Sequence, residues 1–463
     1  MRKEKYLKKI TAVLLCVMLV FSLAACNNGG GSGASGTSAN AASGGKNTTD
    51  ASGKADDPGK SGEPGTNDRT SGKIAELEQK YKNLTQDDLK WEYNTASKTV
   101  VISGKGPMKD YTENAPEWDV YRETAEKIVI GDEVTSVGFG AFLSFSAVTE
   151  VKLGEAVEFV GDYAFDNCIS LRTMNFPSNL KYIGESAFNN ILLHSDNGFK
   201  FPEGMLYIGK YAFHSSFKEG TVTIPATLLV IGKYAFANMF VSGFAVDENN
   251  PNYASVDGVL YDKGITTLIN YPAGKQDKLF TIPDTVTTIC EEAIEVNNTL
   301  EKIVIPASVS SIEEGSIFWN YALTVIDVDA NNNSYKSVDG VLFTKDGKKL
   351  ICYPIASDRT EYTVPQGTER ICKYAMSSAT NLKEIHTNEG LLEIGDTGLY
   401  FCDNLNKLGL PKSLTSIEAK ALALCNSLTE VRYAGTNSDW KNIKIGEQNE
   451  ILTSENVRIY CAE

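Results

Sequence analysis

Apolar and polar residues recur at a regular interval along most of the chain. The segment Val137-Gly138-Phe139-Gly140-Ala141-Phe142 returns in related form at 160–165 and at 183–188. Each copy begins with a valine or isoleucine that we call the anchor. The ten anchors are Val137, Val160, Ile183, Ile208, Ile231, Ile289, Ile312, Ile371, Ile394 and Ile417. The interval from Val137 to Val160 equals the interval from Val160 to Ile183. A constant interval of this length predicts stacked structural repeats rather than a compact globular domain.

Each repeat also predicts a short strand ahead of its anchor. Segments such as Val151-Lys152-Leu153 alternate apolar and polar residues, which places two side chains inward and one outward. A proline often follows and ends the strand, because it has no N–H to donate. The glycine after the anchor indicates a tight turn or a positive φ. The Ala-Phe pair predicts a ladder of stacked rings formed by Phe142, Phe165, Phe188, Phe213 and Phe236.

Two steps between anchors are longer than the others. They run from Ile231 to Ile289 and from Ile312 to Ile371. Both contain alternating segments on either side of a glycine-containing turn, which predicts a β-hairpin. We therefore expect two hairpin insertions, at 244–280 and 324–362, that protrude from one edge of the repeat array.

The repeated phrase carries a resemblance to a known family. From Leu171 to Phe188 the chain reads Leu-x-x-Met-x-Phe-Pro-x-x-Leu-x-x-Ile-Gly-x-x-Ala-Phe, which resembles the BspA-type leucine-rich repeat. The resemblance covers 126–433. It implies a mainly β, right-handed solenoid with short helical turns and with caps at both ends. It also implies a bacterial surface protein that functions in adhesion or host interaction without catalysis.

The two ends of such an array must be covered, because each exposes apolar surface. Residues 73–125 are expected to form the N-terminal cap, with an amphipathic helix near its start, two strands and a loop at 104–108. The residues expected to cover the first coil are Trp91, Tyr93, Trp118 and Tyr121; a glycan-stacking platform is the alternative. Residues 434–463 are expected to form the C-terminal cap, closed by Trp440.

The N-terminal part of the chain predicts export and membrane anchoring. Residues 1–25 combine basic residues, a short apolar run and small residues, as in a secretory signal peptide. The break Leu23-Ala24-Ala25-Cys26 resembles the lipobox of bacterial lipoproteins, and this implies cleavage before Cys26 and diacylglycerol on its sulfur. An ordinary signal peptide followed by an incidental cysteine is the alternative. Residues 26–72 are rich in Gly, Ser and Asn and are expected to form a disordered tether.

Charge excludes one class of partner. The formal net charge is −15, and runs of lysine or arginine are absent from the sequence after Ala25. A surface of this sign repels phosphate backbones, so nucleic acid is not an expected partner. The expected location is extracytoplasmic, at the membrane that holds the lipid.

No catalytic or metal motif stands out in the sequence. The three histidines fall on different repeats, and no Cys-x-x-Cys occurs. The cysteines share repeat positions, which indicates buried packing, although a disulfide between Cys402 and Cys425 remains an alternative. The Asp327–Val338 segment begins like a calcium loop but lacks its glycine and final glutamate, so an Asn-rich turn is favoured. We expect no cofactor and no enzymatic activity.

The remaining candidate is the outward face of the strands that precede the anchors. Extended surfaces of this kind are what repeat arrays use for binding. The candidate face residues are Lys152, Asn175, Lys200, Thr223, Thr281, Asp327, Thr363, His386 and Arg432. A macromolecular partner, either protein or glycan, is the expected ligand, and a merely solvated face is the alternative. Aromatic residues at the hairpin tips, or a pocket beside Tyr253 and Tyr335, would favour a glycan.

Overall fold

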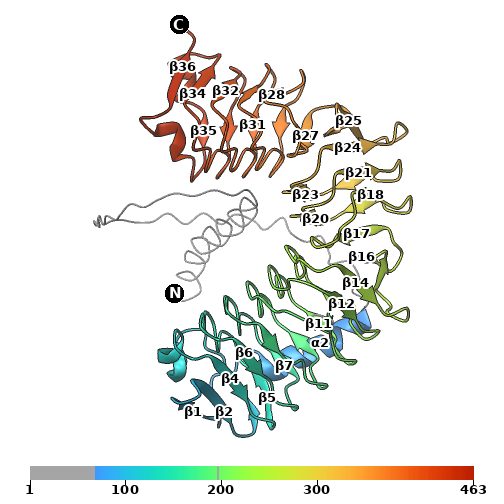
Figure 1. Ribbon diagram of the computed structural model, residues 1–463, viewed down its shortest axis with the longest axis vertical. Coiled ribbons are helices and arrows are strands. Elements are labelled where there is room, and N and C mark those ends of the chain that lie inside the picture. Colours follow the sequence, from blue (N-terminus) through green and yellow to red (C-terminus); the bar gives the residue numbers. More distant parts are fainter. Residues whose placement is uncertain (1–67, 196–197) are drawn as a thin grey trace, which may run out of the picture. The chain divides into compact units, whose positions relative to one another are not determined.

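The structure is a computed structural model that describes residues 68–195 and 198–463. The expected signal peptide, Cys26 and most of the expected tether lie outside the described residues. The described chain is mainly β and forms stacked coils (Figure 1). Each coil contributes a strand that lies ahead of the anchor, which we call a face strand, and a strand that ends at the anchor, which we call an anchor strand.

The face strands are divided among four sheets rather than one. In chain order these sheets contain β1 (Lys90–Asn94), β2 (Thr99–Ser103), β4 (Lys127–Ile130), β6 (Glu150–Lys152) and β8 (Thr173–Met174); β10 (Phe199–Lys200), β12 (Thr221–Ile224) and β14 (Gly243–Val246); β18 (Leu279–Thr281), β21 (Lys302–Ile305) and β24 (Val325–Val328); and β28 (Glu361–Thr363), β30 (Glu384–His386), β32 (Lys407–Leu410), β34 (Glu430–Tyr433) and β36 (Arg458–Cys461). All pairs except β1–β2 are parallel.

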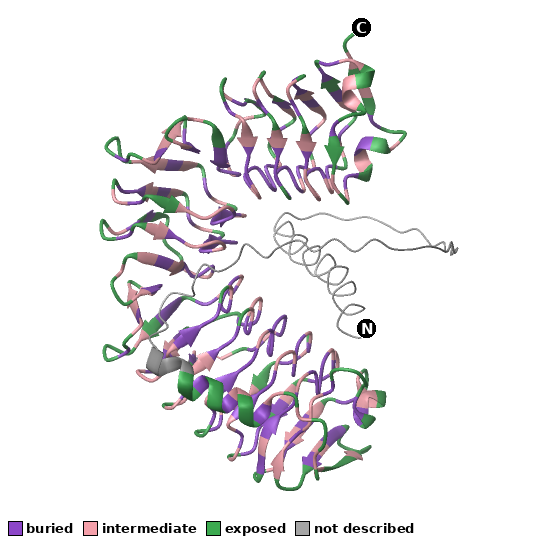
Figure 2. Cartoon of the chain, turned by 180° about the vertical axis from the view of Figure 1, so that it is seen from behind, coloured by how far each residue is buried: buried purple, intermediate pink, exposed green. Residues whose placement is uncertain are grey.

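The anchor strands form three sheets, and a further pair lies in the turns. The sheets contain β3 (Gly106–Pro107), β5 (Val134–Val137), β7 (Phe159–Val160), β9 (Tyr182–Ile183), β11 (Tyr207–Ile208) and β13 (Val230–Ile231); β15 (Tyr253–Val256), β16 (Val259–Asp262), β17 (Thr267–Asn270), β19 (Thr288–Ile289) and β22 (Ser311–Ile312); and β25 (Tyr335–Val338), β26 (Val341–Thr344), β27 (Lys349–Cys352), β29 (Arg370–Ile371), β31 (Glu393–Ile394), β33 (Ser416–Ile417) and β35 (Lys444–Ile445). The turn pair is β20 (Ile294–Glu295) with β23 (Ile317–Phe318). Buried positions recur in every coil (Figure 2).

The predicted phenylalanine ladder is present in the first five coils. The ring centroids of Phe142, Phe165 and Phe188 lie 5.3 and 5.4 Å apart, with interplanar angles of 8° and 5°. The ladder continues to Phe213 and Phe236 at spacings of 5.3 and 6.1 Å. These five side chains are buried, so the ladder is the shared core of these coils.

The glycine after the anchor is required by close packing and not by its own φ. Gly232 is not among the glycines with positive φ, but a Cβ at this position would lie 2.4 Å from the backbone nitrogen of Lys210 in the preceding coil. Positive φ occurs instead at the third and seventh residues after the anchor, such as Tyr234 (φ 60°) and Asn238 (φ 53°). Of the two alternatives expected at the glycine, a tight turn or a positive φ, the positive φ is not found, and the lack of room beside the preceding coil explains the residue.

Aromatic residues cover the first coil. The Trp118 ring, in the short helix η1 (Glu117–Tyr121), stacks on Phe142 at 5.6 Å, and its Nε1 donates to the Ala141 carbonyl at 2.9 Å. Tyr93 stacks on Tyr121 at 3.8 Å. The loop expected at 104–108 contains strand β3, because the Gly106 N–H donates to the carbonyl of Glu133 beside β5.

We expected the helix near the start of the N-terminal cap to belong to the cover of the first coil. The helix α2 (Asp68–Tyr81) instead lies along the side of the array. It begins inside the segment expected to be tether, and its apolar face packs on the anchor strands β7 to β13. Tyr81 stacks on Phe159 at 5.2 Å, and the Tyr182 hydroxyl donates to Glu78 Oε1 at 2.7 Å. In these coils the residue before the anchor is apolar or aromatic, so it needs the cover that α2 provides. Neither α2 nor any other helix in the described part of the chain is long and apolar enough to cross a membrane.

The two insertions form hairpins, but these do not protrude freely. In each one three antiparallel strands follow in order, and the last of them, β17 or β27, pairs in parallel with the next anchor strand. The residues Val259, Leu260 and Tyr261 of the first hairpin are at most 1% exposed. Each insertion therefore contributes a shortened coil, because its last strand occupies an anchor position.

The C-terminal residues continue the stack and close it. The short helix α3 (Asn437–Trp440) starts at a capping box formed by Thr436 and Asp439. The Trp440 ring contacts Tyr433 edge-on at 5.3 Å. After the short helix η2 (Glu450–Thr453), strand β36 pairs with β34. These contacts cover the last coil.

Candidate functional site

The candidate face residues occupy equivalent outward positions on the face strands. Register pairs Lys200 with Thr223, and Thr363 with His386. Lys152, Lys200, Thr281, Thr363, His386 and Arg432 are exposed, whereas Asn175, Thr223 and Asp327 are half-buried. The alternation in the sequence therefore places these positions in rows on the outward side.

The row is not continuous along the array. Hydrogen-bonded pairing stops between β8 and β10, between β14 and β18, and between β24 and β28. The last two breaks coincide with the insertions, where the hairpins take over the connection between coils. A ligand would therefore meet separate segments of sheet rather than one uninterrupted face.

Two of the candidate residues are engaged in local structure. The Asn175 amide exchanges two hydrogen bonds with the backbone of Leu153, at 2.7 and 2.8 Å, and so replaces a strand pair. The Asp327 carboxylate lies 2.5 Å from the ammonium of Lys302. These side chains have less freedom to meet a partner than the exposed members of the row.

The last segment, β28 to β36, is the longest uninterrupted parallel part of the face. One outward row there runs in register through Thr363, His386, Gly409, Arg432 and Tyr460. We call this row the C-terminal face. Tyr460 is 49% exposed and Arg432 is also exposed. Gly409 lies between His386 and Arg432 in this row and adds no side chain to the surface.

A second row of charged residues borders the C-terminal face. It pairs Glu361, Glu384, Lys407, Glu430 and Arg458 in register. Lys407 Nζ lies 2.6 Å from Glu384 Oε1, and this hydrogen bond lowers the pKa of Glu384. Glu384 Oε2 also lies 3.6 Å from His386 Nε2, and the Arg432 guanidinium contacts the Glu430 carboxylate. Both signs of charge and an aromatic ring thus lie together on a solvated surface.

Sequence reasoning missed Tyr460, because it lies beyond the last regular repeat. Residues 434–463 were assigned to the terminal cap, but the alternation Val457-Arg458-Ile459-Tyr460 was not recognised as a strand that pairs with β34. The alternation itself was the available signal, since it has the same period as the face strands.

Buried titratable groups lie inside the turns. The Asn189 amide donates to Asp166 Oδ1 at 2.9 Å, and Asn189 Oδ1 lies 3.1 Å from His214 Nδ1. Burial raises the pKa of Asp166 to about 7 and lowers the pKa of His214 to about 4. The Ser215 hydroxyl oxygen also lies 3.1 Å from His214 Nδ1, the nitrogen that contacts Asn189. An asparagine separates Asp166 from the histidine, so acid, histidine and serine do not form a directly connected triad, and these hydrogen bonds join neighbouring coils.

All seven cysteines in the described part of the chain are free. Cys168, Cys402 and Cys425 each donate to a backbone carbonyl of the preceding coil, at 3.1 to 3.3 Å. Burial raises the pKa of the Cys352 thiol to about 12. Cys168, Cys352, Cys372, Cys402 and Cys425 are thus packed in the core, whereas Cys290 and Cys461 are half-buried. The alternative disulfide between Cys402 and Cys425 is not formed.

The Asn-rich segment of the second insertion is a turn built on a buried side chain. Asn332 is fully buried, and its amide makes four hydrogen bonds to backbone groups. Asp329 accepts the Asn331 N–H at 2.8 Å. The described residues contain no group of three or more His, Cys, Asp or Glu side chains that could hold a metal ion. This geometry supports the Asn-rich turn over the calcium loop.

Tyr253 and Tyr335 do not line a pocket for a ligand. Their rings are buried, and each hydroxyl accepts the N–H of an anchor, Ile231 or Ile312, at 2.8 or 2.7 Å. The two hydroxyls thus provide acceptors for N–H groups of β13 and β22, the strands at which two of the anchor sheets end.

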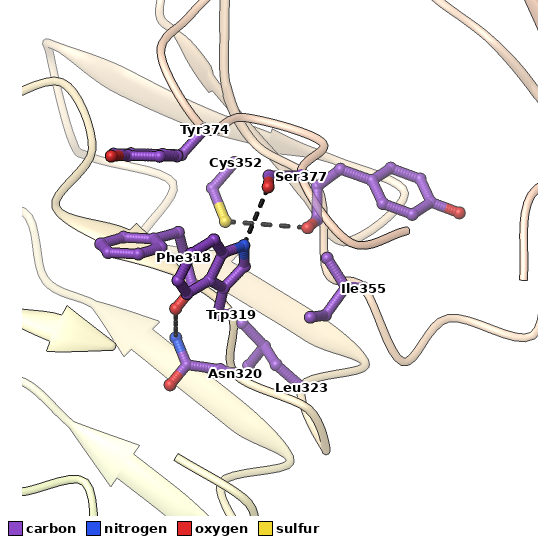
Figure 3. A pocket seen from close by; sticks show the side chains of 9 residues that line it. Phe318, Trp319, Asn320, Leu323, Cys352, Ile355, Tyr374 and Ser377 are labelled. Atoms are coloured by element: carbon purple, nitrogen blue, oxygen red, sulfur yellow. Dashed lines mark hydrogen bonds between the residues drawn. The ribbon is translucent and has the colours of Figure 1, made fainter. Parts of the chain in front are cut away.

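A small recess lies where the second insertion shortens its coil (Figure 3). Trp319 Nε1 donates to Ser377 Oγ at 2.8 Å, and the Phe318 ring stacks on Tyr374 at 4.5 Å. Other lining residues include Asn320, Leu323, Cys352 and Ile355. These side chains leave no room even for a sphere the size of water, so the recess does not fit a small-molecule ligand.

Comparisons with known proteins agree with this architecture. A family model described as "BspA type Leucine rich repeat region (6 copies)" matches residues 120–241, 275–345 and 355–448. No curated protein matches the chain.

Several solved structures are similar to this chain. A leucine-rich repeat protein from Eubacterium ventriosum is 24% identical, with a TM-score of 0.52 over 78% of this chain and 92% of that one. A leucine rich cell surface protein from Faecalibacterium prausnitzii is 21% identical, with a TM-score of 0.42 over 78% of this chain and 97% of that one. The first likeness supports the leucine-rich repeat fold, and the family model covers more than half of the sequence. The chain belongs to the BspA-type leucine-rich repeat family.

Proposed function

We propose that this protein is a non-catalytic repeat protein of the cell surface that binds a macromolecule through its C-terminal face. The observation that carries the proposal is the unbroken register from Thr363 to Tyr460, which sets exposed His386, Arg432 and Tyr460 in one row. Repeat arrays present extended surfaces of this kind to their partners. Tyrosine and arginine are also the residues that most often dominate binding energy at interfaces.

A large partner fits this surface better than a small substrate. The recess near Trp319 has no room for a ligand. The acids whose pKa values are raised most, such as Asp166 and Glu295, are buried in turns away from solvent. The C-terminal face instead offers solvated charges of both signs beside one ring, which suits complementary polar groups on a protein.

Protein is favoured over glycan as the class of partner. A glycan chain is held by several exposed rings on which successive sugars stack, whereas the C-terminal face offers one ring, Tyr460, among charges of both signs. Tyr253 and Tyr335 are buried. Adhesion to host proteins is the role that we infer for such a surface. Capture of a glycan or of cell-wall polymer is the alternative outcome of the test.

Binding should depend on the C-terminal face and not on the first face sheets. We expect residues 68–463, which keep α2 whole, to bind a member of a panel of immobilised extracellular proteins, tested beside a glycan array. Arg432→Ala with Tyr460→Ala should weaken that binding about 30-fold, which corresponds to about 2 kcal/mol for two interface hot spots. Surface plasmon resonance with the purified variants measures the change.

The matched control is Lys152→Ala with Lys200→Ala, which removes two exposed side chains from earlier face strands. This variant should bind like the wild type. Equal binding by both double variants would contradict a role for the C-terminal face, and binding to glycans alone would support the alternative function.

We also propose that lipid on Cys26 holds the protein at the outer side of the membrane. The support is the order of basic residues, apolar run, small residues and cysteine in the segment that ends at Cys26. Two or more acyl chains hold a protein stably at a bilayer, whereas one chain does not. Partner binding would then take place at the cell surface.

Replacing Cys26 should release the protein from the membrane. Cells expressing wild type are expected to incorporate labelled fatty acid into this protein and to retain it in the membrane fraction. Cys26→Ala should abolish the label and shift the protein to the soluble fraction, because the acceptor sulfur is lost. Cys16→Ala is the control within the signal peptide; persistent labelling of Cys26→Ala would refute the anchor.

A further inference from the structure

The turns of successive complete coils are joined by backbone hydrogen bonds. Ser215, the seventh residue after its anchor, donates its N–H to the Ala237 carbonyl at 3.0 Å, and Asn190 donates to the His214 carbonyl at 2.9 Å in the same way. The third and fifth residues after the anchor make similar bonds, as at Tyr211 and Phe213. This pattern fixes one turn onto the next.

The pattern changes at the first insertion, because the shortened coil has only a short turn, at 273–274, in place of the longer turn that follows the other anchors. Its strand β17 pairs with β19, and its Tyr271 N–H donates directly to the Ala293 carbonyl at 2.7 Å. The turn after Ile231 therefore faces the turn after Ile289 across this coil. We call the contact between residues 233–238 and 291–295 the seam.

Between other neighbouring turns, backbone hydrogen bonds make the connection. Across the seam, glutamate side chains accept the hydrogen bonds instead. The Asn238 N–H donates to Glu295 Oε1, and the Tyr234 hydroxyl donates to Glu291 Oε2. Glu291 is well compensated, since Lys233 Nζ lies 3.0 Å and Lys373 Nζ 2.5 Å from its carboxylate.

Glu292 and Glu295 form no direct ion pair of this kind, although the charges of Lys373, Lys233 and Lys210 act on Glu292 from farther away. Glu295 is only 3% exposed, and the hydrogen bond that it accepts comes from the neutral Asn238 amide. Glu292 Oε2 is enclosed and has no hydrogen-bond partner. The other charged or titratable groups that act on the pair are Lys210, Tyr211, Lys233, Tyr234, Glu291, Lys373 and Tyr374. Glu313 contacts Lys233, and Asp396 acts on Tyr374. Lys233 is shared between Glu291 and Glu313, so it does not neutralise the pair.

We propose that Glu292 and Glu295 form a proton-operated lock on the seam, closed by proton uptake in mild acid and loosened when both carboxylates ionise. A protonated pair avoids two uncompensated charges in a confined site, whereas an ionised pair repels itself and attracts water. The proton comes from solvent through half-buried Glu292. The lock sets how firmly the first group of coils holds the next.

The direction of the pH dependence follows from the shifted groups. Burial raises the pKa of Glu292 to about 7, and burial together with the Glu292 charge raises the pKa of Glu295. Because these values exceed that of an unfolded glutamate, about 4.3, the closed seam is stabilised at low pH and loses this contribution as pH rises through about 7.

Hydrogen exchange at one amide tests the lock in the full-length protein. Protection of the Asn238 amide, corrected for the intrinsic effect of pH, should fall about tenfold or more between pH 5.5 and pH 8.0. The Asn190 amide is the internal control, since it donates to a backbone carbonyl at the same repeat position, and its protection should stay constant. Equal behaviour of the two amides would overturn the proposal.

A variant separates ionisation from hydrogen bonding. Glu295→Gln retains an oxygen that can accept the Asn238 N–H but cannot ionise, so the loss of protection at pH 8.0 should disappear. Glu203→Gln, at an exposed site, should leave the loss unchanged. A pH-dependent loss that persists in Glu295→Gln would also overturn the proposal. The comparison of the two wild-type amides stays decisive even if this variant fails to fold.

Discussion

Replacing Phe165 by alanine is expected to lower the free energy of unfolding by about 3–5 kcal/mol, the usual cost of truncating a buried phenylalanine. The Phe165 ring is fully buried and stacks on Phe142 and Phe188 at 5.3 and 5.4 Å. Its backbone N–H also donates to Ala187 in the next coil. Truncation would leave a cavity between two stacked rings that regular coil spacing prevents from closing.

Chemical denaturation followed by circular dichroism measures this loss. Val120→Ala is the control, because Val120 is 77% exposed and its truncation should leave the transition unchanged. An unchanged transition for Phe165→Ala would contradict the ladder as the core of the first coils.

Replacing Asn332 by alanine is expected to destabilise the second insertion by about 3–5 kcal/mol, because a buried polar group that loses its partner costs about 1–3 kcal/mol and several would lose theirs at once. The Asn332 amide donates to the carbonyls of Pro306 and Val309 at 2.8 and 2.9 Å and accepts the N–H groups of Ser334 and Tyr335 at 2.9 and 2.8 Å. The same arrangement recurs at Asn250 in the first insertion.

Thermal unfolding of Asn332→Ala and Asn331→Ala, each with and without calcium, measures this effect. Asn331 is exposed and contributes its backbone N–H rather than its side chain to the turn, so its variant should unfold like the wild type. Calcium should shift neither transition. A rise in the wild-type midpoint on adding calcium would favour the calcium loop that the turn geometry argues against.

The regular part of the fold could be predicted because each coil repeats one local packing rule. The anchor, the alternating strand and the Ala-Phe pair each depend on neighbours one period away, so the positions of Val160 and Phe165 imply their partners. The close contact at Gly232 was less accessible, since its cause is the backbone of Lys210 in another coil. A preference for glycine indicates either a positive φ or a lack of room, and the sequence does not separate the two.

The position of α2 shows where local pattern stops being informative. Its helical spacing was readable, but spacing does not identify the surface that the helix covers. A signal existed in the residues just before the anchors. They are apolar or aromatic where α2 packs, at Phe159, Tyr182 and Val230, and polar elsewhere, as at Ser311. Consecutive coils with outward apolar residues require a cover.

The insertions were recognised as related hairpins, but their role as shortened coils was missed. Leu268 pairs with Ile289 and Leu350 pairs with Ile371, so each leucine occupies the anchor position of the shortened coil. The spacing between each leucine and the next anchor is close to the repeat period and could have shown the match. The turns of these coils are shortened, at 273–274 and 355–356. This shortening creates the seam and the recess, and it followed only from the arrangement in space.

The alternation of apolar and polar residues predicted which positions of the candidate face point outward. It did not predict where the pairing between neighbouring face strands stops. Strand breaks depend on how hairpins connect neighbouring coils, which no local period encodes. The engagement of Asn175 with the Leu153 backbone and the addition of Tyr460 to the row likewise depend on contacts between coils. The candidate site therefore narrowed from the whole array to its last five face strands.

The claim that the C-terminal face binds a macromolecular partner is tested most directly by mapping where that partner protects the protein. Hydrogen–deuterium exchange of the protein, with and without the ligand found in the binding screen, measures this. Protection is expected to concentrate on β28, β30, β32, β34 and β36, centred on Arg432 and Tyr460. Protection confined to the hairpins, to α2 or to the first face sheets would contradict it.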